Sequence, residues 1–368
     1  MTEPVAGTVS DSEETRCGYV ALAGRPNVGK STLMNHLLGR KLSITSRKPQ
    51  TTRQALIGIL TRGNAQIVFV DTPGIHVASG RALKGGRALK GGRALKGGRA
   101  LNRYMVGQAV GSLAGVELAL MLVEASGWHE GDEIVRRRIH EADVPCMCVI
   151  NKIDRLRRKD RLLPLLDALS RKHDFEALVP VSALRNLALD DLLDEIVGRL
   201  PRRAHLFAAD EITDRSVAFL VGEIVREKAM RRLGDELPHQ TAVTVERIAL
   251  AAERNSTSDG DNTASQLDSK DDVLPRTGQG ESCAEVDAVI YVERETQKRI
   301  AIGKGGTMLK SIGEDARKDI EILLGSQAMV RLWVKVDRRW SGRPEALQRF
   351  GYHSPPSPPS QDVRKGGH

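Results

Sequence analysis

The chain has 368 residues, enough for about two domains, and its longest apolar run, residues 118–123, is too short to span a bilayer. Its four cysteines show neither a metal-site spacing nor a disulfide framework, and its polar, acidic start is unlike a secretory signal. Composition therefore argues against a membrane-spanning protein and a disulfide-rich secreted one, and we expect a soluble protein of the reducing cytoplasm.

The formal net charge of +9 would suggest a polyanionic partner, but much of it comes from one repeat. Residues 80–97 are three copies of the sequence GRALKG, and each copy adds two positive charges. Leucines six residues apart are ~120° out of step on a helix, and paired glycines weaken it further. We interpret the repeat as a flexible basic loop from a tolerated duplication. An arm for RNA or anionic lipid is the alternative.

The first predicted strand, residues 19–23, leads into a sequence with the spacing of a phosphate-binding loop, and a helical pattern follows it. Main-chain N–H groups of such a loop and the N-terminus of the helix would surround a phosphate. Lys30 would reach the outer phosphates, and the Ser31 hydroxyl would ligate Mg²⁺. The residues predicted to line this loop are Gly24, Arg25, Pro26, Asn27, Val28, Gly29, Lys30, Ser31 and Thr32.

Two further strands are predicted at residues 55–60 and 66–70, with a turn between them. The second ends at Asp71, and an aspartate at the end of a buried strand close to a phosphate loop is placed to hold Mg²⁺ through a water. A turn without a ligand would look similar in isolation. The nucleotide-site residues predicted here are Asp71, Thr72, Pro73, Gly74 and Ile75.

Predicted strands at residues 117–123, 145–150 and 178–181 continue an alternating α/β pattern. Cys146 and Cys148 share one face of the middle strand, and we interpret them as core residues. The last two strands lead into loops at the carboxyl edge of the sheet, where open α/β sheets bind ligands. These loops contain Asn151, Lys152 and Asp154, and Ser182, Ala183 and Leu184.

The loops that follow the last two of these predicted strands indicate that the bound base is guanine. A carboxylate at Asp154 has two acceptor oxygens that match N1–H and the exocyclic amine of guanine, whereas adenine has no such pair of donors. A buried Asp154 left unpaired would disfavour ATP. We expect Asn151 to bond the other edge of the base, the Lys152 stem to cover the ring, and the N–H of Ala183 to meet the base oxygen.

The pattern changes after a predicted helix that Pro201 ends. Helix, strand, strand, helix, helix and strand follow, and a G-x-x-G loop joins the last two helices. Such a loop can clamp ~4 nucleotides of a single strand, although alone it could equally be a helix-ending turn. Aromatic residues are only 3% of the chain, which argues against an RNA-stacking sheet. The residues predicted to contact RNA are Ile302, Gly303, Lys304, Gly305, Gly306 and Lys310.

These motifs together resemble a translation-factor-class GTPase, and residues 43–53 are similar to the Era family of bacterial ribosome-assembly GTPases. The resemblance implies an α/β P-loop GTPase domain, with a six-stranded mixed sheet and helices on both faces, followed by an α+β type II KH domain. It implies GTP or GDP and Mg²⁺ as ligands, with Thr52 as the switch threonine on the metal and Thr51 as the neighbouring candidate. The implied partner is small-subunit ribosomal RNA near its 3′ end, within the small subunit.

The resemblance also suggests a cytoplasmic monomer with peripheral contact with the inner face of the cell membrane. We divide the chain into a disordered N-terminus, a GTPase domain, a linker, a KH domain and a mostly disordered tail, which are residues 1–16, 17–203, 204–214, 215–340 and 341–368. The repeat falls in the second switch of the GTPase domain. A second insertion, residues 253–285, interrupts the KH domain and has a composition typical of disorder.

The expected reaction is hydrolysis of GTP by an in-line water, with Lys30, Thr52, Asp71 and Gly74 around the terminal phosphate. Ile75 stands where Ras-like enzymes have the glutamine that orients water, so we expect slow intrinsic turnover. In related GTPases an asparagine at the position of Asn27 holds K⁺, and we expect the same here. The alternatives are an RNA-binding scaffold that holds guanine nucleotide without turnover, and a P-loop kinase or ATPase.

Overall fold

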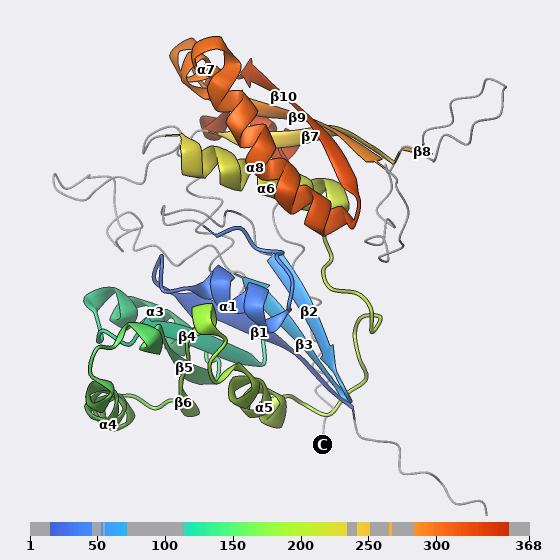
Figure 1. The fold of residues 1–368 in the computed structure, drawn as a ribbon. Helices are drawn as coiled ribbons and strands as arrows, with labels where there is room; N and C mark the ends of the chain where they lie inside the picture. The colour runs from blue at the N-terminus through green and yellow to red at the C-terminus, as the bar shows by residue number, and fades with distance from the viewer. Residues whose placement is uncertain are drawn as a thin grey trace, which may run out of the picture.

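The structure is a computed structural model that describes residues 15–45, 53, 56–71, 113, 115–233, 241–250, 265–266 and 283–352. These residues form two α/β units, which Figure 1 shows one above the other. The repeat at residues 80–97 lies outside the described residues.

The first unit is built on a six-stranded sheet with the order β2-β3-β1-β4-β5-β6. All its neighbouring strands are parallel except the hairpin of β2 and β3, which is antiparallel. This confirms the mixed sheet. The strands are β1 (Arg16–Gly24), β2 (Leu56–Arg62), β3 (Ala65–Asp71), β4 (Leu118–Glu124), β5 (Cys146–Asn151) and β6 (Ala177–Pro180).

Helices cover both faces of this sheet, so β3 is buried at every residue and β4 at almost every one. α1 (Lys30–Leu37) and α5 (Leu189–Arg199) share a core with one face. α3 (Glu130–Glu141) and α4 (Leu162–Lys172) pack on the other, where Cys148 is buried as expected. Burial raises the pKa of the Cys146 thiol to about 12, which fits an inert core residue.

The strand register brings the ends of β1, β3, β4 and β5 to one edge of the sheet. Leu22 of β1 pairs with Asp71, the last residue of β3. Gly24, which ends β1, pairs with Leu122 of β4, and Glu124 of β4 pairs with Asn151 of β5. The predicted phosphate, metal and base motifs are therefore neighbours in space.

The second unit has the sheet order β10-β9-β7-β8, with helices packed on one face. β9 runs antiparallel to β7 and parallel to β10. Apart from the additional two-residue strand β8, the observed order of helices and strands is the one predicted for a KH domain. The elements are α6 (Val217–Arg232), β7 (Ala242–Leu250), β8 (Ser265–Gln266), β9 (Cys283–Val292), α7 (Glu295–Ile302), α8 (Thr307–Leu324) and β10 (Gln327–Val336).

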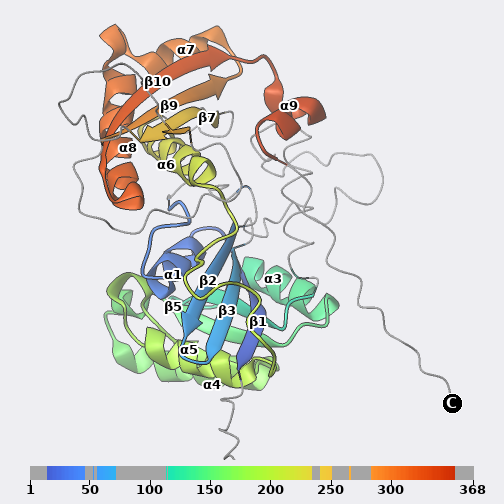
Figure 2. The same ribbon diagram turned by 90° about the vertical axis from the view of Figure 1, so that its right-hand side faces the viewer.

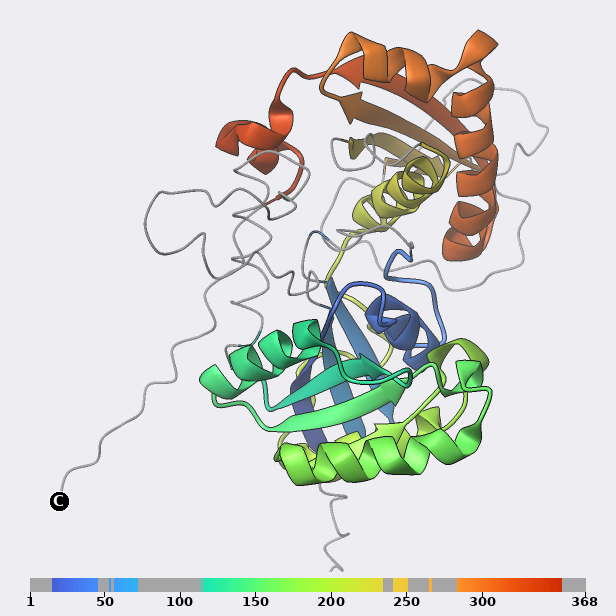
Figure 3. The ribbon, with the colours of Figure 1, turned by 90° about the vertical axis from the view of Figure 1, so that its left-hand side faces the viewer.

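Two segments that we expected to be disordered contain ordered residues. Within the insertion at 253–285, the short β8 pairs with β7, and β9 already begins at Cys283. The tail expected from residue 341 is folded as far as Tyr352, through η6 (Trp340–Gly342) and α9 (Pro344–Arg349). Figures 2 and 3 show α9 beside the sheet, on the side away from α8.

The segment between the two units is bound to the first sheet rather than free. The Gln66 side chain accepts hydrogen bonds from the main-chain N–H groups of Leu206 (2.8 Å) and Phe207 (3.0 Å). Thr213 donates from Oγ1 to the main-chain oxygen of Ile57 at 2.7 Å. The linker therefore carries the chain along the edge of the first unit to α6.

Candidate nucleotide site and candidate RNA-binding groove

The loop between β1 and α1 wraps around the side chain of Lys30. Gly24 and Gly29 have φ values of 149° and 107°, which favour glycine, and a Cβ on Gly29 would collide with the Asn151 amide. Lys30 donates from Nζ to the main-chain oxygens of Gly24 (2.9 Å) and Arg25 (3.1 Å). Burial lowers the pKa of Lys30 to about 8, although Asp71 raises it. An anion beside this ammonium group would offset the cost of its burial.

The metal motifs meet at a buried carboxylate. Ser31 donates from Oγ to Oδ2 of Asp71 at 3.0 Å, and Ser43 donates to the same oxygen at 2.6 Å. Asn35 of α1 fixes Ser43, because its Oδ1 accepts from the Ser43 N–H (2.8 Å) and its Nδ2 donates to the Ser43 oxygen (2.7 Å). Hydroxyl and carboxylate oxygens are the ligands that Mg²⁺ prefers, so this donor set fits the ion. Ser43 and Asn35 were not predicted from the sequence.

Asn151 joins three loops of the site. Its Nδ2 donates to the main-chain oxygen of Val28 at 2.9 Å, and its Oδ1 accepts from the N–H groups of Lys152 (2.8 Å) and Ala183 (3.0 Å). We expected the Asn151 amide and the Ala183 N–H to face the base. In this structure they bond to each other, so Asn151 holds the phosphate loop against the base-binding loops.

Lys152 forms a second bridge to the phosphate loop. Its Nζ donates to the main-chain oxygen of Asn27 at 2.5 Å and also pairs with Glu124. Burial alone would raise the pKa of Glu124, but the hydrogen bond and charge of Lys152 lower it below its ordinary value. Glu124 is therefore an ionised partner that sequence reasoning missed, although the register of β4 and β5 places it beside Asn151.

The base-reading carboxylate is oriented by the following loop. Ser182, which is buried, donates from Oγ to Oδ1 of Asp154 at 2.5 Å. Asp154 itself is exposed, contrary to the buried carboxylate that we expected. The discrimination against adenine that we expect of Asp154 would therefore depend on the two donors of guanine rather than on burial. Leu184 follows in the same loop and is also exposed.

Three further residues of the predicted phosphate loop are Arg25, Asn27 and Val28. Arg25 forms an ion pair with the buried Asp132 of α3, with 2.6 Å between Nε and Oδ1. Asn27 is exposed with a φ of 65°, and Val28 is buried. Some predicted site residues lie outside the described part of the chain, namely Thr51, Thr52, Thr72, Pro73, Gly74 and Ile75.

The G-x-x-G turn between α7 and α8 has the backbone of a glycine-dependent loop. Gly303, Gly305 and Gly306 have φ values of 76°, 59° and 80°. A Cβ on Gly303 would lie 2.7 Å from Cβ of Met308, whereas the space beside Gly305 and Gly306 is open. The turn therefore presents bare backbone to a ligand at the start of α8.

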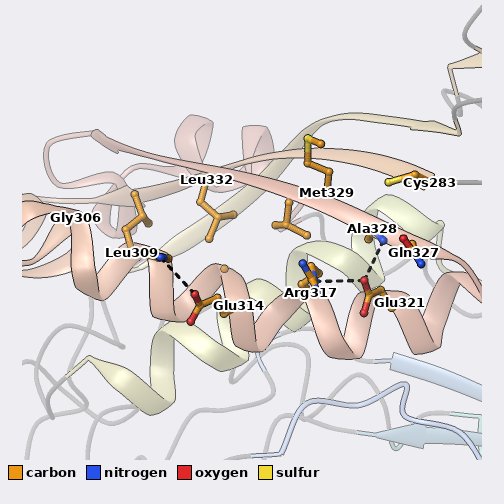
Figure 4. A pocket seen from close by; sticks show the side chains of 13 residues that line it. Cys283, Gly306, Leu309, Glu314, Arg317, Glu321, Gln327, Ala328, Met329 and Leu332 are labelled. Atoms are coloured by element: carbon orange, nitrogen blue, oxygen red, sulfur yellow. Dashed lines mark hydrogen bonds and ion pairs between the residues drawn. The ribbon is translucent and has the colours of Figure 1, made fainter.

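A groove of about 730 Å³ runs from this turn between α8 and β10. Figure 4 shows Gly306, Leu309 and Arg317 on its α8 side and Leu332 of β10 opposite. Gly313, seven residues after Gly306 and on the same face of α8, also lines the groove and was not predicted. The predicted Lys310 lines it too, while Lys304 is exposed in the turn.

The described residues contain no group of three or more His, Cys, Asp or Glu arranged to hold a metal ion. No helix in the described part of the chain is long and apolar enough to cross a membrane.

Comparison with known proteins matches both units. Residues 19–152 match the family described as 50S ribosome-binding GTPase, and residues 275–341 match the KH domain family. The chain is 42% identical over 345 residues to the GTPase Era of Marinobacter nauticus, which covers 94% of this chain and 97% of that protein. It is 44% identical over 341 residues to the GTPase Era of Xanthomonas oryzae pv. oryzae, which covers 93% and 98%.

Two solved structures match the described architecture across both domains. A crystal structure of Era in complex with MgGDPNP and nucleotides 1506–1542 of 16S ribosomal RNA has a TM-score of 0.74 and 37% identity, and covers 92% of this chain and 99% of that chain. A variant of Aquifex aeolicus Era bound to GDP·AlF4⁻ has a TM-score of 0.74 with 36% identity and the same coverage.

Proposed function

The chain belongs to the Era family of GTPases, and from this premise we propose that bound nucleotide controls how tightly it holds ribosomal RNA. The chain hydrolyses GTP to GDP and phosphate and binds ribosomal RNA in ribosome assembly. The observation that carries the proposal is the meeting of Lys30, the Ser31 and Asp71 pair, and Asn151 at one edge of the sheet.

Each of these residues has a separate task. Lys30 holds the outer phosphates, since a phosphate would satisfy an ammonium group that burial disfavours. Ser31 and Asp71 hold Mg²⁺, which supplies positive charge to the phosphates when bound. Asn151 keeps the phosphate loop and the base loops in one arrangement, and Asp154 selects guanine.

The groove between α8 and β10 is the proposed RNA site. Gly306 and Gly313 leave gaps between the side chains of its α8 wall, so a nucleotide backbone can approach the helix closely at these two positions. Lys304 places positive charge at the turn. Lys310 and Arg317 line the groove in ion pairs with Glu314 and Glu321, so phosphates would compete with these carboxylates for the two cations. The related Era structure contains nucleotides 1506–1542 of 16S ribosomal RNA, which supports small-subunit RNA as the ligand of this groove.

Phosphate release from GTP, measured with and without an RNA of the 16S 3′ end, tests the proposal. We expect slow release from the chain alone and tighter RNA binding with a non-hydrolysable GTP analogue than with GDP. No release in either condition would instead favour a scaffold that holds guanine nucleotide without turnover. Tight binding of ATP would favour a P-loop kinase or ATPase.

The proposal includes K⁺ at the phosphate loop beside Asn27. Asn27 is exposed, and its main-chain oxygen accepts a hydrogen bond from Lys152 of the predicted base-binding loop. A K⁺ ion here would add positive charge where Ras-like enzymes use other groups. Turnover should be faster in K⁺ buffer than in Na⁺ buffer, and equal rates would reject the idea.

We also propose that the chain acts as a cytoplasmic monomer with peripheral contact with the inner face of the cell membrane. The family resemblance is the support for each of these statements. Analytical ultracentrifugation tests the monomer. Flotation of the purified chain with vesicles of anionic phospholipid tests membrane contact, and recovery of the protein only in the unbound fraction would argue against it.

A further inference from the structure

The carboxylate of Asp71 is held by a second hydroxyl group, which belongs to a buried segment between the two domains. Residues 41–45, which we call the bridge segment, follow α1, and the three central residues of this segment are buried. Ser43 is 2% exposed, and its Oγ donates at 2.6 Å to Oδ2 of Asp71, the same oxygen that accepts from Ser31. The middle of the bridge segment is therefore bonded directly to a predicted metal ligand.

The side chain of Asn35 fixes the backbone of the bridge segment. Its Oδ1 accepts from the N–H groups of Leu42 (3.0 Å) and Ser43 (2.8 Å), and its Nδ2 donates to the main-chain oxygen of Ser43 at 2.7 Å. Asn35 lies one turn after Ser31 on the same face of α1. Since one helix carries both Ser31 and the side chain that fixes Ser43, the two hydroxyl groups are held on either side of one carboxylate oxygen.

The two ends of the bridge segment are attached to the KH domain. Lys41 forms ion pairs with Glu227 of α6 (2.8 Å) and Asp319 of α8 (2.6 Å). Burial alone would lower the pKa of Lys41, but its hydrogen bonds to these two carboxylates raise it above its ordinary value. At the other end, Arg231 of α6 donates from Nη2 to the main-chain oxygen of Thr45 at 2.9 Å. Figure 3 shows this segment, in blue, between α1 and the helices of the KH domain.

The bond from Ser43 bears on the direction in which the Asp71 carboxylate points. The terminal torsion of an aspartate side chain is broad, so hydrogen bonds decide its orientation. Removing a group that orients a metal ligand typically weakens metal binding about 10-fold to 100-fold. Ser43 lies two residues from each end of the bridge segment, which is at most ~7 Å along the chain. A displacement of either end by the KH domain would therefore reach the carboxylate.

We propose that Ser43 is a positioning residue that holds Asp71 in place for Mg²⁺, and that the KH domain sets the position of Ser43 through Lys41. The affinity of the nucleotide site for Mg²⁺ then depends on Asp319, a residue of the helix that forms one wall of the RNA groove. This inference rests on the proposed function, in which Ser31 and Asp71 hold Mg²⁺. It adds to that function a physical connection between the metal ligands and the KH domain.

The test measures the Mg²⁺ concentration that half-maximally slows the release of fluorescently labelled GDP from the full chain. Ser43→Ala removes only the hydroxyl group, and it should raise this concentration about 10-fold or more. Ser170→Ala is the matched control, because Ser170 is an exposed serine that donates to the main-chain oxygen of Asp167 within α4. Affinity for GDP in EDTA should be the same in the parent and both variants, whereas a misfolded site would lose it.

Asp319→Asn tests the connection to the KH domain. It removes the charge that pairs with Lys41 and nearly keeps the shape of the side chain, so the Mg²⁺ concentration should rise several-fold. Lys41→Met breaks the same ion pair from the other side and should have a similar effect. Asp315→Asn is the matched control, because Asp315 lies one turn earlier on α8 and pairs at 2.7 Å with Arg232 of the same domain. Ser43→Ala combined with Asp319→Asn should exceed Ser43→Ala alone only slightly, since Asp319 acts through Ser43.

A second contact between the domains serves as a further control. Arg53 donates from Nη1 to the main-chain oxygen of Thr241 at 2.8 Å and to Oη of Tyr352 at 3.1 Å. Tyr352→Phe weakens this contact without changing the bridge segment, so the Mg²⁺ concentration should stay at the parent value. A rise as large as that of Asp319→Asn would mean that any loosening of the two domains has the same effect, and it would overturn the route through Lys41.

An unchanged Mg²⁺ concentration in Ser43→Ala would overturn the inference. A lower concentration would overturn it too, because Ser43 would then compete with the ion for Asp71. Parent values in both Asp319→Asn and Lys41→Met would refute the connection to the KH domain. Each of these results leaves GTP hydrolysis and RNA binding by the chain intact. If GDP release from the parent does not respond to Mg²⁺ at all, the proposed metal role of Ser31 and Asp71 fails, and this inference fails with it.

Discussion

Replacing Lys30 with methionine should change how the stability of the nucleotide-free protein depends on pH. Lys30 is 7% exposed, and its burial lowers its pKa from 10.5 to about 8. Between these two values the unfolded chain binds the proton and the folded chain releases it. The stability of the parent protein therefore rises with pH across this window, and the electrostatic cost is present in full below it.

The size of the effect follows from the difference between the two pKa values. At about 1.36 kcal/mol per pKa unit, the protonated Lys30 costs about 3 kcal/mol at pH 7, and about 1 kcal/mol of this remains at pH 9.5. Methionine is uncharged in both states. The stability of Lys30→Met relative to the parent should therefore decrease by about 2 kcal/mol between these pH values. Lys30→Met also loses the two hydrogen bonds of Nζ, and each loss lowers its stability by about 1 kcal/mol. These losses offset the gain in stability at pH 7, but they hardly change between the two pH values.

Urea unfolding followed by far-ultraviolet circular dichroism measures this difference at pH 7 and pH 9.5. Lys310→Met is the matched control, because the Lys310 side chain is 78% exposed and should show no such trend. GDP should stabilise the parent much more than Lys30→Met. A stability difference between Lys30→Met and the parent that is the same at both pH values would refute the reasoning.

The remaining predictions concern the recognition of the base by Asp154, the G-x-x-G turn, and the hydrogen bonds by which Asn151 joins the loops of the nucleotide site. Asp154→Asn should shift preference from GTP towards xanthosine triphosphate in calorimetric titrations, with Asp160→Asn as an exposed control; unchanged GTP affinity would contradict the base assignment. Gly306→Asp should abolish RNA binding in filter assays and spare GDP affinity, whereas Gly63→Asp, at a turn glycine with φ of 58°, should leave RNA binding intact. Asn151→Ala removes the hydrogen bonds to three loops and should weaken GDP binding about 10-fold or more, and a normal affinity would count against this role of Asn151.

Much of the nucleotide site could be predicted because short motifs build it locally. The strand, turn and helix around Gly24 and Lys30 depend on glycine conformations and spacing that are visible in the sequence. Asp71 could be placed because it ends an apolar strand, which is observed as β3. The alternation of strands and helices then required these strand ends to share one edge of the sheet.

Contacts that depend on the tertiary fold could not be predicted in the same way. The role of Ser43 follows from its bond to Asp71, 28 residues away, and that of Glu124 from its bond to Lys152, again 28 residues away. Neither residue has a local signal that separates it from ordinary surface polar residues. Asn151 was recognised, but its bond to Val28 requires the exact packing of two loops.

The end of the KH domain was misjudged for a related reason. Its aromatic residues are sparse, and Pro and Ser residues just beyond them dominate the composition of the tail. α9 has only six residues, too few for a convincing helical period. The segment is ordered because Trp340 and Phe350 find partners in Ala242 and Tyr291, which lie on distant strands.

The position of the contacts between the two domains bears on the effect expected of the repeat at residues 80–97. The family resemblance places this repeat in the second switch, where an insertion would weaken communication between nucleotide and RNA if the second switch were the only connection. The described contacts of Lys41 and Arg53 with the KH domain precede the repeat in the chain. Asp319, the partner of Lys41, lies on α8, the helix that begins directly after Gly306 and forms one wall of the RNA groove; Gly306 is ~20 Å away along its axis. α8 thus connects the contact with Lys41 to the groove by a route that does not pass through the repeat.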